Sequence, residues 1–400
     1  MTMAGPARDV VVVGGGPAGA AAAVMLKQQG RDVVLLDEAR FPRDKVCGEG
    51  VSPEAWRLLA GLGAAGAVRS LAPHPLWGMA VSAPDGTCSR GDYRGAAQPG
   101  FAVRRERLDR VLLDRAREAG VEVREATRVT DVLWHEGTVE GVIAANGAGP
   151  ETLRARLVIG ADGRRSVVAR RLGLLGEHPR LRKFAVRGYW AGMQGLEERG
   201  QMHIGGGGYC GVAPLSASEA NVTFVLDRPE MAAAGGELEG FYRRSLRRWP
   251  RIAERLEKAT LLSPPRAIGP LALESAGVSA PGALLVGDAA GFYDPFTGEG
   301  ITLALRSAEL AAETADRFFR SSSHAGLRDY DRARHAATRH KFLFNRLLQV
   351  VVGRPWLANA VVKRLARRPD IAHRMVSIAG DFVPARTALG PGFLLDLLLA

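Results

Sequence analysis

The N-terminal stretch up to Asp37 combines a strand, a glycine-rich turn, a helix and a second strand that ends in an acid. Residues 9–13 include four consecutive valines, which predict a fully buried strand. The turn that follows has the pattern Gly-x-Gly-x-x-Gly and comprises Gly14, Gly16, Pro17, Ala18 and Gly19. Residues 18–29 are rich in alanine and predict a helix, and residues 33–36 predict a second buried strand. This order is a complete βαβ unit, so we expect an α/β fold.

Each part of this unit has a task in binding a dinucleotide. Gly14 allows the tight turn, Gly16 lets the backbone approach a pyrophosphate, and Gly19 lets the helix pack closely on the strand. The helix N-terminus offers free N–H groups to the phosphates. Asp37 follows Gly14 by about twenty positions, where an acid accepts both ribose hydroxyls. We therefore expect a site for the adenosine diphosphate of FAD or NAD; a glycine-rich turn in an unrelated α/β protein is the alternative.

Composition supports a globular chain without metal clusters. The 400 residues are 46% hydrophobic and 24% charged, which suits one to three domains with an ample core. The cysteines Cys47, Cys88 and Cys210 lie far apart, which excludes a zinc ribbon or an iron–sulfur ligand set in this chain. Few cysteines favour a reducing compartment, and no segment approaches about 18 uninterrupted apolar residues. We therefore expect a cytoplasmic protein without a transmembrane helix.

Positive charge is concentrated near the C-terminus of a chain whose net charge is +12. Residues 341–400 hold nine Lys or Arg against three Asp, and apolar clusters lie at 342–344, 347–348 and 350–352. A basic and apolar segment predicts peripheral contact with a membrane surface or an acidic partner. An arginine-rich cap of packed helices is the alternative. No recognition motif accompanies the charge, so no nucleic-acid partner is expected, and no feature indicates an oligomeric state.

Two further motifs follow predicted strands. Asp162-Gly163-x-x-Ser166 comes after a buried strand and before a helix, where an ordinary capped turn is the alternative interpretation. A longer motif, residues 287–301, begins with Gly-Asp at a strand end, so Asp288 is expected at the sheet edge where ligands bind. Its second part runs from Pro295 to Ile301 and starts another helix, whose N–H groups can stabilise negative charge.

With these three motifs in this order, the chain resembles the p-hydroxybenzoate-hydroxylase-like flavoproteins over roughly residues 9–320. The resemblance implies that Asp37 binds the adenosine ribose of FAD and that Asp288 contacts the ribityl chain. It also implies Arg105 near the flavin phosphates and a backbone contact from Val129 to adenine. The full set of expected FAD-binding residues is Gly14, Gly16, Pro17, Ala18, Gly19, Asp37, Arg105, Val129, Asp162, Asp288, Pro295, Gly298, Gly300 and Ile301.

The same resemblance implies the domain plan. We expect a glutathione-reductase-type Rossmann FAD-binding domain, an inserted and mainly antiparallel β-sheet substrate domain, and a helical C-terminal segment. The expected FAD-binding segments are 1–75, 101–174 and 271–325, the substrate segments are 76–100 and 175–270, and the helical C-terminal region is 326–400.

The segment Phe41-Pro-Arg-x-Lys-x-Cys47-Gly48-Glu49-Gly50 resembles the geranylgeranyl reductase family, as do residues 287–301. The resemblance implies that Cys47 faces the substrate side of the flavin. The candidate catalytic residues are Cys47, Glu299 and Tyr209. A small residue in a tight loop is the alternative for Cys47, and a solvated loop glutamate is the alternative for Glu299.

One departure concerns the substrate domain. Prenyl reductases usually carry Tyr-x-Trp-x-Phe-Pro, whereas this chain has Tyr209-Cys-Gly211-Val-Ala213-Pro. Gly211 and Ala213 replace the two large aromatic residues, which would widen the pocket for a ring or a bulky lipid. Flavin halogenases typically carry Trp-x-Trp-x-Ile-Pro, and no such pair of tryptophans is present, so halogenation is disfavoured.

These features predict an FAD-dependent oxidoreductase. A monooxygenase that oxidises a lipophilic polyketide-, aromatic- or isoprenoid-type substrate with reduced flavin and O2 is slightly favoured, because the aromatic motif is missing. A reductase of C=C bonds in a prenyl or quinone substrate is the alternative, and a flavin electron-transfer module that docks through the basic C-terminal region is a further one. No second nucleotide-binding βαβ unit is evident, so NADH or NADPH is expected as a transient electron donor.

Overall fold

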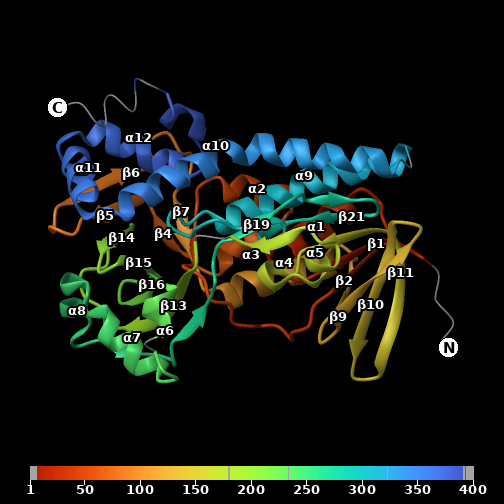
Figure 1. Ribbon diagram of the computed structural model, residues 1–400, viewed down its shortest axis with the longest axis horizontal. Helices are drawn as coiled ribbons and strands as arrows, with labels where there is room; N and C mark the ends of the chain where they lie inside the picture. Colours follow the sequence, from red (N-terminus) through yellow and green to blue (C-terminus); the bar gives the residue numbers. More distant parts are fainter. Residues whose placement is uncertain (1–6, 179–180, 233, 322, 391, 393–400) are drawn as a thin grey trace.

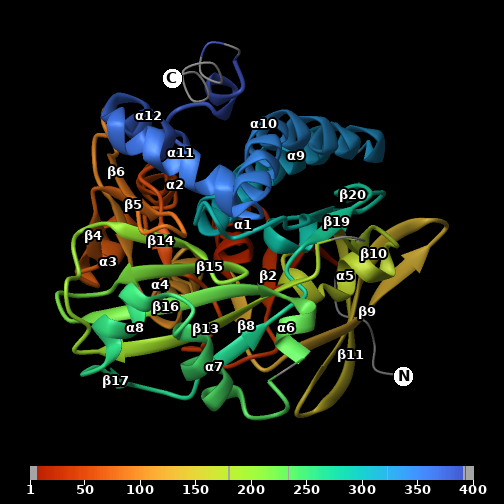
Figure 2. The same ribbon diagram turned by 60° about the vertical axis from the view of Figure 1, so that its left-hand side comes forward.

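The computed structural model describes residues 7–178, 181–232, 234–321, 323–390 and 392, and it has the mixed α/β architecture that the sequence predicts. Figure 1 shows two sheet-based units side by side, with C-terminal helices across the top of the view. The turned view in Figure 2 keeps these helices above both sheets. The candidate site lies between the two units.

The first unit is built on a parallel sheet. Strand β1 (Arg8–Val13) lies in its middle and pairs in parallel with β2 (Val33–Leu36) and β11 (Gly149–Gly160). The strands β8 (Glu122–Arg124) and β21 (Ala283–Leu285) extend the parallel order to β21-β11-β1-β2-β8. Antiparallel additions are β9 (Arg128–His135), β10 (Thr138–Asn146) and β20 (Ser279–Ala280). The valines of β1 are almost fully buried, so the predicted βαβ unit is confirmed.

Helix α1 (Pro17–Gln28) connects β1 to β2 and packs against α4 (Arg105–Glu118) and α9 (Gly300–Ser321). Its approach to the glycine turn is close, because a Cβ on Gly19 would lie 1.8 Å from the carbonyl oxygen of Gly14. Short elements complete this part of the fold: α2 (Ala55–Gly61), α3 (Ala65–Ser70), α5 (Val167–Arg171), β3 (Gly50–Val51), β4 (His74–Leu76), β7 (Gly100–Ala102), β12 (Leu175–Glu177), β19 (Leu273–Ser275), η1 (Gly163–Arg165) and η2 (Gly287–Ala290).

The second unit is a mainly antiparallel sheet in the order β17-β13-β16-β15-β14-β5-β6, with β18 also on β13. Only β14 and β5 pair in parallel among the strand pairs described for it. Its strands are β5 (Gly78–Ser82), β6 (Cys88–Asp92), β13 (Lys183–Ala191), β14 (Gly200–Gly205), β15 (Gly208–Pro214), β16 (Glu219–Asp227), β17 (Thr260–Leu261) and β18 (Arg266–Ile268). An aromatic core around Phe224, Tyr242 and Trp249 packs one face against α7 (Leu238–Leu246) and α8 (Pro250–Leu256), with α6 (Arg228–Ala232) nearby.

The C-terminal helices bridge the two units. Helix α10 (Asp329–Val352) packs against α9 of the first unit, whereas α11 (Pro355–Arg367) and α12 (Pro369–Ala379) pack against β6 of the second. Two 3-10 turns, η3 (His324–Arg328) and η4 (Ala385–Ala388), flank them. Within the described residues, no helix is both long and apolar enough to cross a membrane.

Replacement of Gly19 by Ala is expected to lower the free energy of unfolding by about 1–3 kcal/mol or more, because backbone must move to admit the methyl group. The matched control is Gly66→Ala in α3, where a Cβ meets nothing within 4 Å. That change is expected to be neutral or to stabilise by up to about 1 kcal/mol. Urea unfolding measures both variants, and equal midpoints would contradict the close packing of α1 on its turn.

Candidate functional site

A cavity lies between the carboxyl ends of the parallel strands and one face of the second sheet. Most predicted site residues line it, although they come from distant segments of the chain. These residues are Gly16, Pro17, Ala18, Cys47, Arg105, Tyr209, Asp288, Pro295, Gly298, Gly300 and Ile301. The predicted residues outside the cavity lining are Gly14, Gly19, Asp37, Val129, Asp162 and Glu299.

The glycine turn holds Asp37 in place. The Asp37 carboxylate accepts hydrogen bonds from the backbone N–H groups of Gly15, at 2.7 Å, and Ala39, at 2.8 Å. Its side chain is only 8% exposed, so it is fixed at the end of β2. Gly14 has a φ of +104°, and a Cβ there would lie 2.5 Å from the carbonyl oxygen of Ala161. The turn therefore places the immobilised carboxylate of Asp37 next to tightly packed glycine backbone.

The backbone at this turn fits the pyrophosphate of FAD. A Cβ on Gly16 would meet only an Arg43 guanidinium nitrogen, at 3.5 Å. Arg43 also lies 3.2 Å from a carboxylate oxygen of Asp109 and 3.9 Å from one of Asp37. A free backbone surface with a guanidinium over it is a suitable cradle for phosphate oxygens.

Arg105 begins α4 and is held by a buried, two-pronged ion pair. Its Nε and Nη2 donate to the two carboxylate oxygens of Asp109, at 2.7 and 2.8 Å. Burial alone would lower the pKa of Arg105, but the charge of Asp109 and the Cys47 sulfur raise it above its ordinary value. Arg105 is therefore a permanent positive charge beside Cys47 and is not a solvated helix residue.

Val129 and Asp162 are two of the predicted cofactor contacts that lie outside the cavity wall. Val129 is a buried residue of β9 whose backbone pairs with Ala144. The Asp162 carboxylate accepts from the Ser166 hydroxyl, at 2.5 Å, and from the backbone of Val167, at 2.6 Å. Burial raises the pKa of Asp162, and these hydrogen bonds oppose that rise. The Asp162 side chain is therefore committed to the start of α5, which leaves only its backbone for a cofactor.

The loop that leads into α9 forms the opposite wall. Asp288 lies just after β21, and the Lys45 amine is 3.7 Å from its carboxylate. Gly298 has a φ of +69°, and a Cβ there would meet nothing within 4 Å. The neighbouring Thr297 hydroxyl is buried and has no hydrogen-bond partner among the described residues. Open backbone, an orphaned hydroxyl and the first turn of α9 together fit the polar edge of a flavin ring.

Glu299 is paired with residues of the C-terminal helices. Its side chain turns away from the cavity and meets the Lys341 amine, at 2.5 Å, and the Asn345 amide, at 2.9 Å. Lys341 also lies 2.5 Å from a carboxylate oxygen of Asp381 and donates to the carbonyl of Ile378. A buried ammonium requires such partners, so Glu299 links the α9 loop to the C-terminal helices. Glu299 is therefore buried and paired rather than solvated, and its catalytic role stays a prediction.

Tyr209 lies on the face of β15 that lines the cavity. Its hydroxyl donates to Asp294 at 2.7 Å, and its ring meets Phe296 edge to face at 5.0 Å. Burial and the Asp294 carboxylate raise the pKa of Tyr209 well above its ordinary value. Burial also raises the pKa of Asp294, which Lys183 opposes from 3.6 Å. Tyr209 therefore stays protonated and is oriented toward the loop before α9.

Glu49 is the principal site residue that the sequence analysis left without a role. It is 1% exposed and accepts from the Arg105 backbone, at 2.9 Å, from the Tyr189 hydroxyl and from the Asn221 amide, at 3.0 Å. Asn221 also donates to the Cys47 carbonyl, at 2.8 Å. The sequence signal that could have identified Glu49 is its position between two glycines in a loop. Glu49 fixes the loop that carries Cys47 against both units.

The predicted widening of the pocket is visible at β15. Gly211 and Ala213 both line the cavity. A Cβ on Gly211 would meet its nearest neighbour, the Met202 methyl group, at 3.6 Å, which is ordinary contact. Close backbone packing therefore does not require a glycine at position 211. The cavity has room on this side for a substrate.

Comparison with known proteins finds FAD-binding relatives of this chain. Residues 7–198 match the family described as FAD binding domain. Menaquinone reductase of Mycolicibacterium smegmatis is 33% identical over 324 residues, which cover 76% of this chain and 75% of the relative. Digeranylgeranylglycerophospholipid reductase of Methanosarcina mazei is 30% identical over 305 residues, covering 72% of this chain and 70% of the relative.

Among solved structures, a flavin-dependent halogenase is similar, with a TM-score of 0.82 and 25% identity; the likeness covers 96% of this chain and 77% of the halogenase. Its fold agrees with the expected flavoprotein architecture. The chain therefore belongs to the family of FAD-dependent oxidoreductases that contains menaquinone reductase and the digeranylgeranylglycerophospholipid reductases.

Proposed function

We propose that the protein reduces C=C bonds in an isoprenoid lipid or a prenylated quinone. The observation that carries this proposal is a second, almost wholly apolar cavity next to the first. The two cavities share wall residues Met79, Met202, Phe296 and Thr297. A long flexible hydrocarbon chain would suit an apolar chamber that lies next to the proposed flavin cavity.

The second cavity lies between the second sheet and the C-terminal helices. Its lining comes from β5, β6 and β14 and from α10, α11 and α12. Residues that represent these helices are Phe344, Leu348, Val361, Leu365 and Met375. Because the wall is aliphatic, it favours hydrocarbon over a polar ligand. The names of the two relatives, a quinone reductase and a geranylgeranyl-lipid reductase, support the same substrate class.

Within this proposal, each cavity wall has a task. Asp37 binds the adenosine ribose, the Gly16 backbone and Arg43 hold the pyrophosphate, and Gly298 to Ile301 meet the flavin ring. FAD supplies the two-electron transfer between a nicotinamide donor, NADH or NADPH, and the substrate. Saturation of one C=C bond also requires protons, so a donor group must face the substrate.

Cys47 is the proposed proton donor. Its sulfur lies in the cavity wall and interacts with Arg105. Loss of the thiol proton to a substrate carbon leaves a thiolate, which the neighbouring guanidinium stabilises, and solvent returns the proton afterwards. Tyr209 is the second candidate, but its hydroxyl already donates to Asp294. We assign Tyr209 the role of shaping the cavity beside the α9 loop.

A monooxygenase is the second candidate function. The specific observation in its favour is the space beside Gly211 and Ala213, where a ring could lie. The apolar chamber beside the first cavity favours the reductase, because a compact aromatic substrate would leave that chamber unused.

Asp37→Ala is expected to purify with little FAD, because the ribose hydroxyls lose their acceptor and the Gly15 N–H loses its partner. The ratio of flavin to protein absorbance measures retention. Asp32→Ala is the matched control, since Asp32 is an exposed acid that pairs with Arg8 on the surface. Full flavin content in Asp37→Ala would overturn the assignment of Asp37.

The proposed reaction is tested by anaerobic and aerobic turnover with menaquinone and geranylgeranyl lipids, analysed by mass spectrometry. The expected product gains the mass of two hydrogen atoms under both conditions. Incorporation of heavy oxygen from labelled O2, without saturated product, would overturn the reductase proposal and favour the monooxygenase.

Cys47→Ser is expected to lower kcat by about 100-fold while FAD stays bound, because a hydroxyl is a much weaker acid than a thiol. Cys88→Ser is the matched control, because Cys88 is an exposed residue of β6. Unchanged turnover in Cys47→Ser would return Cys47 to a structural role in its loop.

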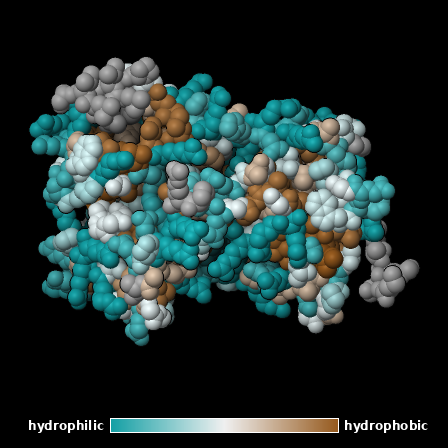
Figure 3. Space-filling view, viewed as in Figure 1, coloured by the Kyte–Doolittle hydropathy of each residue, from teal (hydrophilic) through white to brown (hydrophobic). Residues whose placement is uncertain are grey.

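We also propose that the C-terminal helices touch a membrane surface. Leu343, Leu347 and Val350 form an exposed apolar stripe on α10, and Trp356 at the start of α11 is 69% exposed. The exposed cation Arg354 lies between them in the sequence. Figure 3 shows apolar surface gathered over the C-terminal helices at the upper left. A lipid substrate could pass from such a surface into the apolar chamber beneath the same helices.

The double variant Leu343→Ser/Leu347→Ser is expected to weaken binding to anionic phospholipid vesicles at least about tenfold, because two buried apolar contacts with lipid are lost. Vesicle co-sedimentation gives the measurement. Leu262→Ser is the control, since Leu262 is 44% exposed on a different part of the surface. Equal sedimentation of all three proteins would contradict the proposed membrane face.

A further inference from the structure

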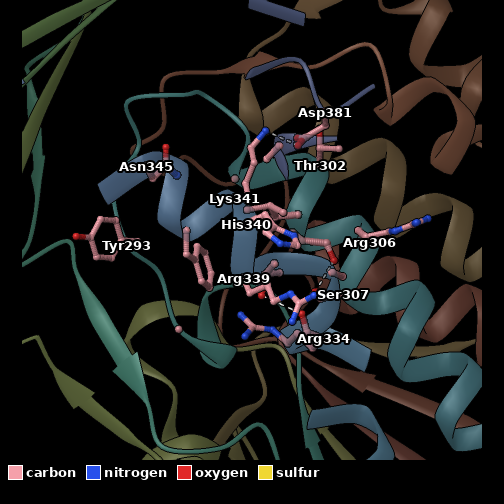
Figure 4. A pocket seen from close by; sticks show the side chains of 18 of the residues that line it. Tyr293, Thr302, Arg306, Ser307, Arg334, Arg339, His340, Lys341, Asn345 and Asp381 are labelled. Carbon is pink, nitrogen blue, oxygen red and sulfur yellow. Dashed lines mark hydrogen bonds and ion pairs between the residues drawn. The ribbon is translucent and has the colours of Figure 1, made fainter. Parts of the chain in front are cut away.

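A separate polar cavity lies on the opposite side of the α9 loop, between α9, α10 and the segment after α12 (Figure 4). It shares the wall residues Gly287, Asp288, Phe292, Gly300 and Ala304 with the proposed flavin cavity. The two cavities are therefore separated by one stretch of loop and the first turn of α9. The basic side chains that line the polar cavity are Arg306, Arg334, Arg339, His340, Lys341 and Arg386.

The residues that line this cavity include more positive charges than their carboxylates neutralise. Its acids already have cationic partners: Glu54 pairs with Arg57, Asp288 with Lys45, Asp294 with Lys183 and Asp381 with Lys341. In Figure 4, Lys341 turns toward Asp381 and away from the remaining cations. By contrast, Arg334, Arg339 and Arg386 have no carboxylate within ion-pair distance in the described part of the chain. Unbalanced positive charge therefore remains in the cavity.

Arg334 is the most informative of these arginines. It lies on the inward side of α10, one turn from the buried residues Tyr330 and Thr338. Its Nε is buried and has no hydrogen-bond partner among the described residues. Burial lowers the pKa of its guanidinium, with partial compensation from Tyr330 and Asp331. A buried guanidinium N–H without a partner is costly, so its presence beside this cavity points to a ligand that completes the hydrogen bonds of Arg334.

We propose that this cavity binds the phosphate group of a small anionic ligand, with Arg334 as its buried anchor and Arg339 and Arg386 at its rim. A planar guanidinium presents paired N–H donors that match two phosphate oxygens, which a carboxylate-paired lysine cannot do. Two ligands carry this chemistry here, a phosphorylated nicotinamide dinucleotide and a prenyl diphosphate. The first would place the electron donor beside the flavin loop, and the second would place the head of a substrate there.

This inference rests in part on the proposed reductase function, so phosphate binding is measured without turnover. Calorimetry of the FAD-loaded protein with inorganic pyrophosphate gives a dissociation constant. Arg334→Gln is expected to raise that constant at least about tenfold, and Arg334→Lys is expected to recover only part of the loss. Arg339→Gln, on the exposed rim, gives a smaller loss and keeps the test valid if Arg334→Gln folds poorly. Arg320→Gln, a surface arginine at the other end of α9, is the matched control.

Competition identifies the source of the phosphate. Displacement of pyrophosphate by NADPH but not by NADH supports the nucleotide, and displacement by geranylgeranyl diphosphate supports the lipid. Equal pyrophosphate binding by wild type, Arg334→Gln and Arg339→Gln, or no binding by wild type, would overturn the site. Turnover driven by dithionite bypasses the nucleotide, so its absence in wild type would count against the reductase proposal and leave the phosphate result standing.

Discussion

The buried carboxylate of Glu49 is the interaction on which the site depends. It receives hydrogen bonds from α4 of the first unit and from β13 and β16 of the second, so one side chain joins both sheets. The same Asn221 amide that meets Glu49 also holds the Cys47 carbonyl. Burial raises the pKa of Glu49, and its hydrogen bonds oppose that rise. The position of Cys47 relative to Arg105 therefore depends on a buried hydrogen-bond network that joins both units.

The parts of the fold that the sequence predicts are those specified locally. Four valines, a glycine turn and an alanine-rich helix determine their own βαβ unit, because strand burial and turn geometry need no distant partner. The clearest example is Gly14, whose positive φ in the turn after β1 favours glycine whatever packs against it. Asp288 and the α9 loop were equally predictable, since both follow a buried strand at the ligand-binding edge of the sheet.

The parts that escaped prediction depend on residues far apart in the sequence. Glu299 was predicted as a candidate catalytic residue, and the sequence did not predict that Lys341 and Asn345 of α10 hold its carboxylate. No local sequence pattern predicts that pairing, because it follows from how α10 packs on α9. The apolar chamber likewise forms only when strands of the second sheet meet three C-terminal helices. Glu49 was visible in the sequence as an acid between glycines, yet its partners were not.

The path of the chain between the two sheets has a consequence for how the protein assembles. The chain leaves the parallel sheet after β2, returns to it at β8, leaves again after β11 and returns once more at β20. Strand β5 pairs with β14, which follows it by about a hundred residues in the sequence, so the second sheet cannot form until both segments are present. Neither unit can be expressed from a single continuous stretch, so the two are expected to fold as one cooperative body. A substitution that destabilises either sheet is then expected to unfold both units together.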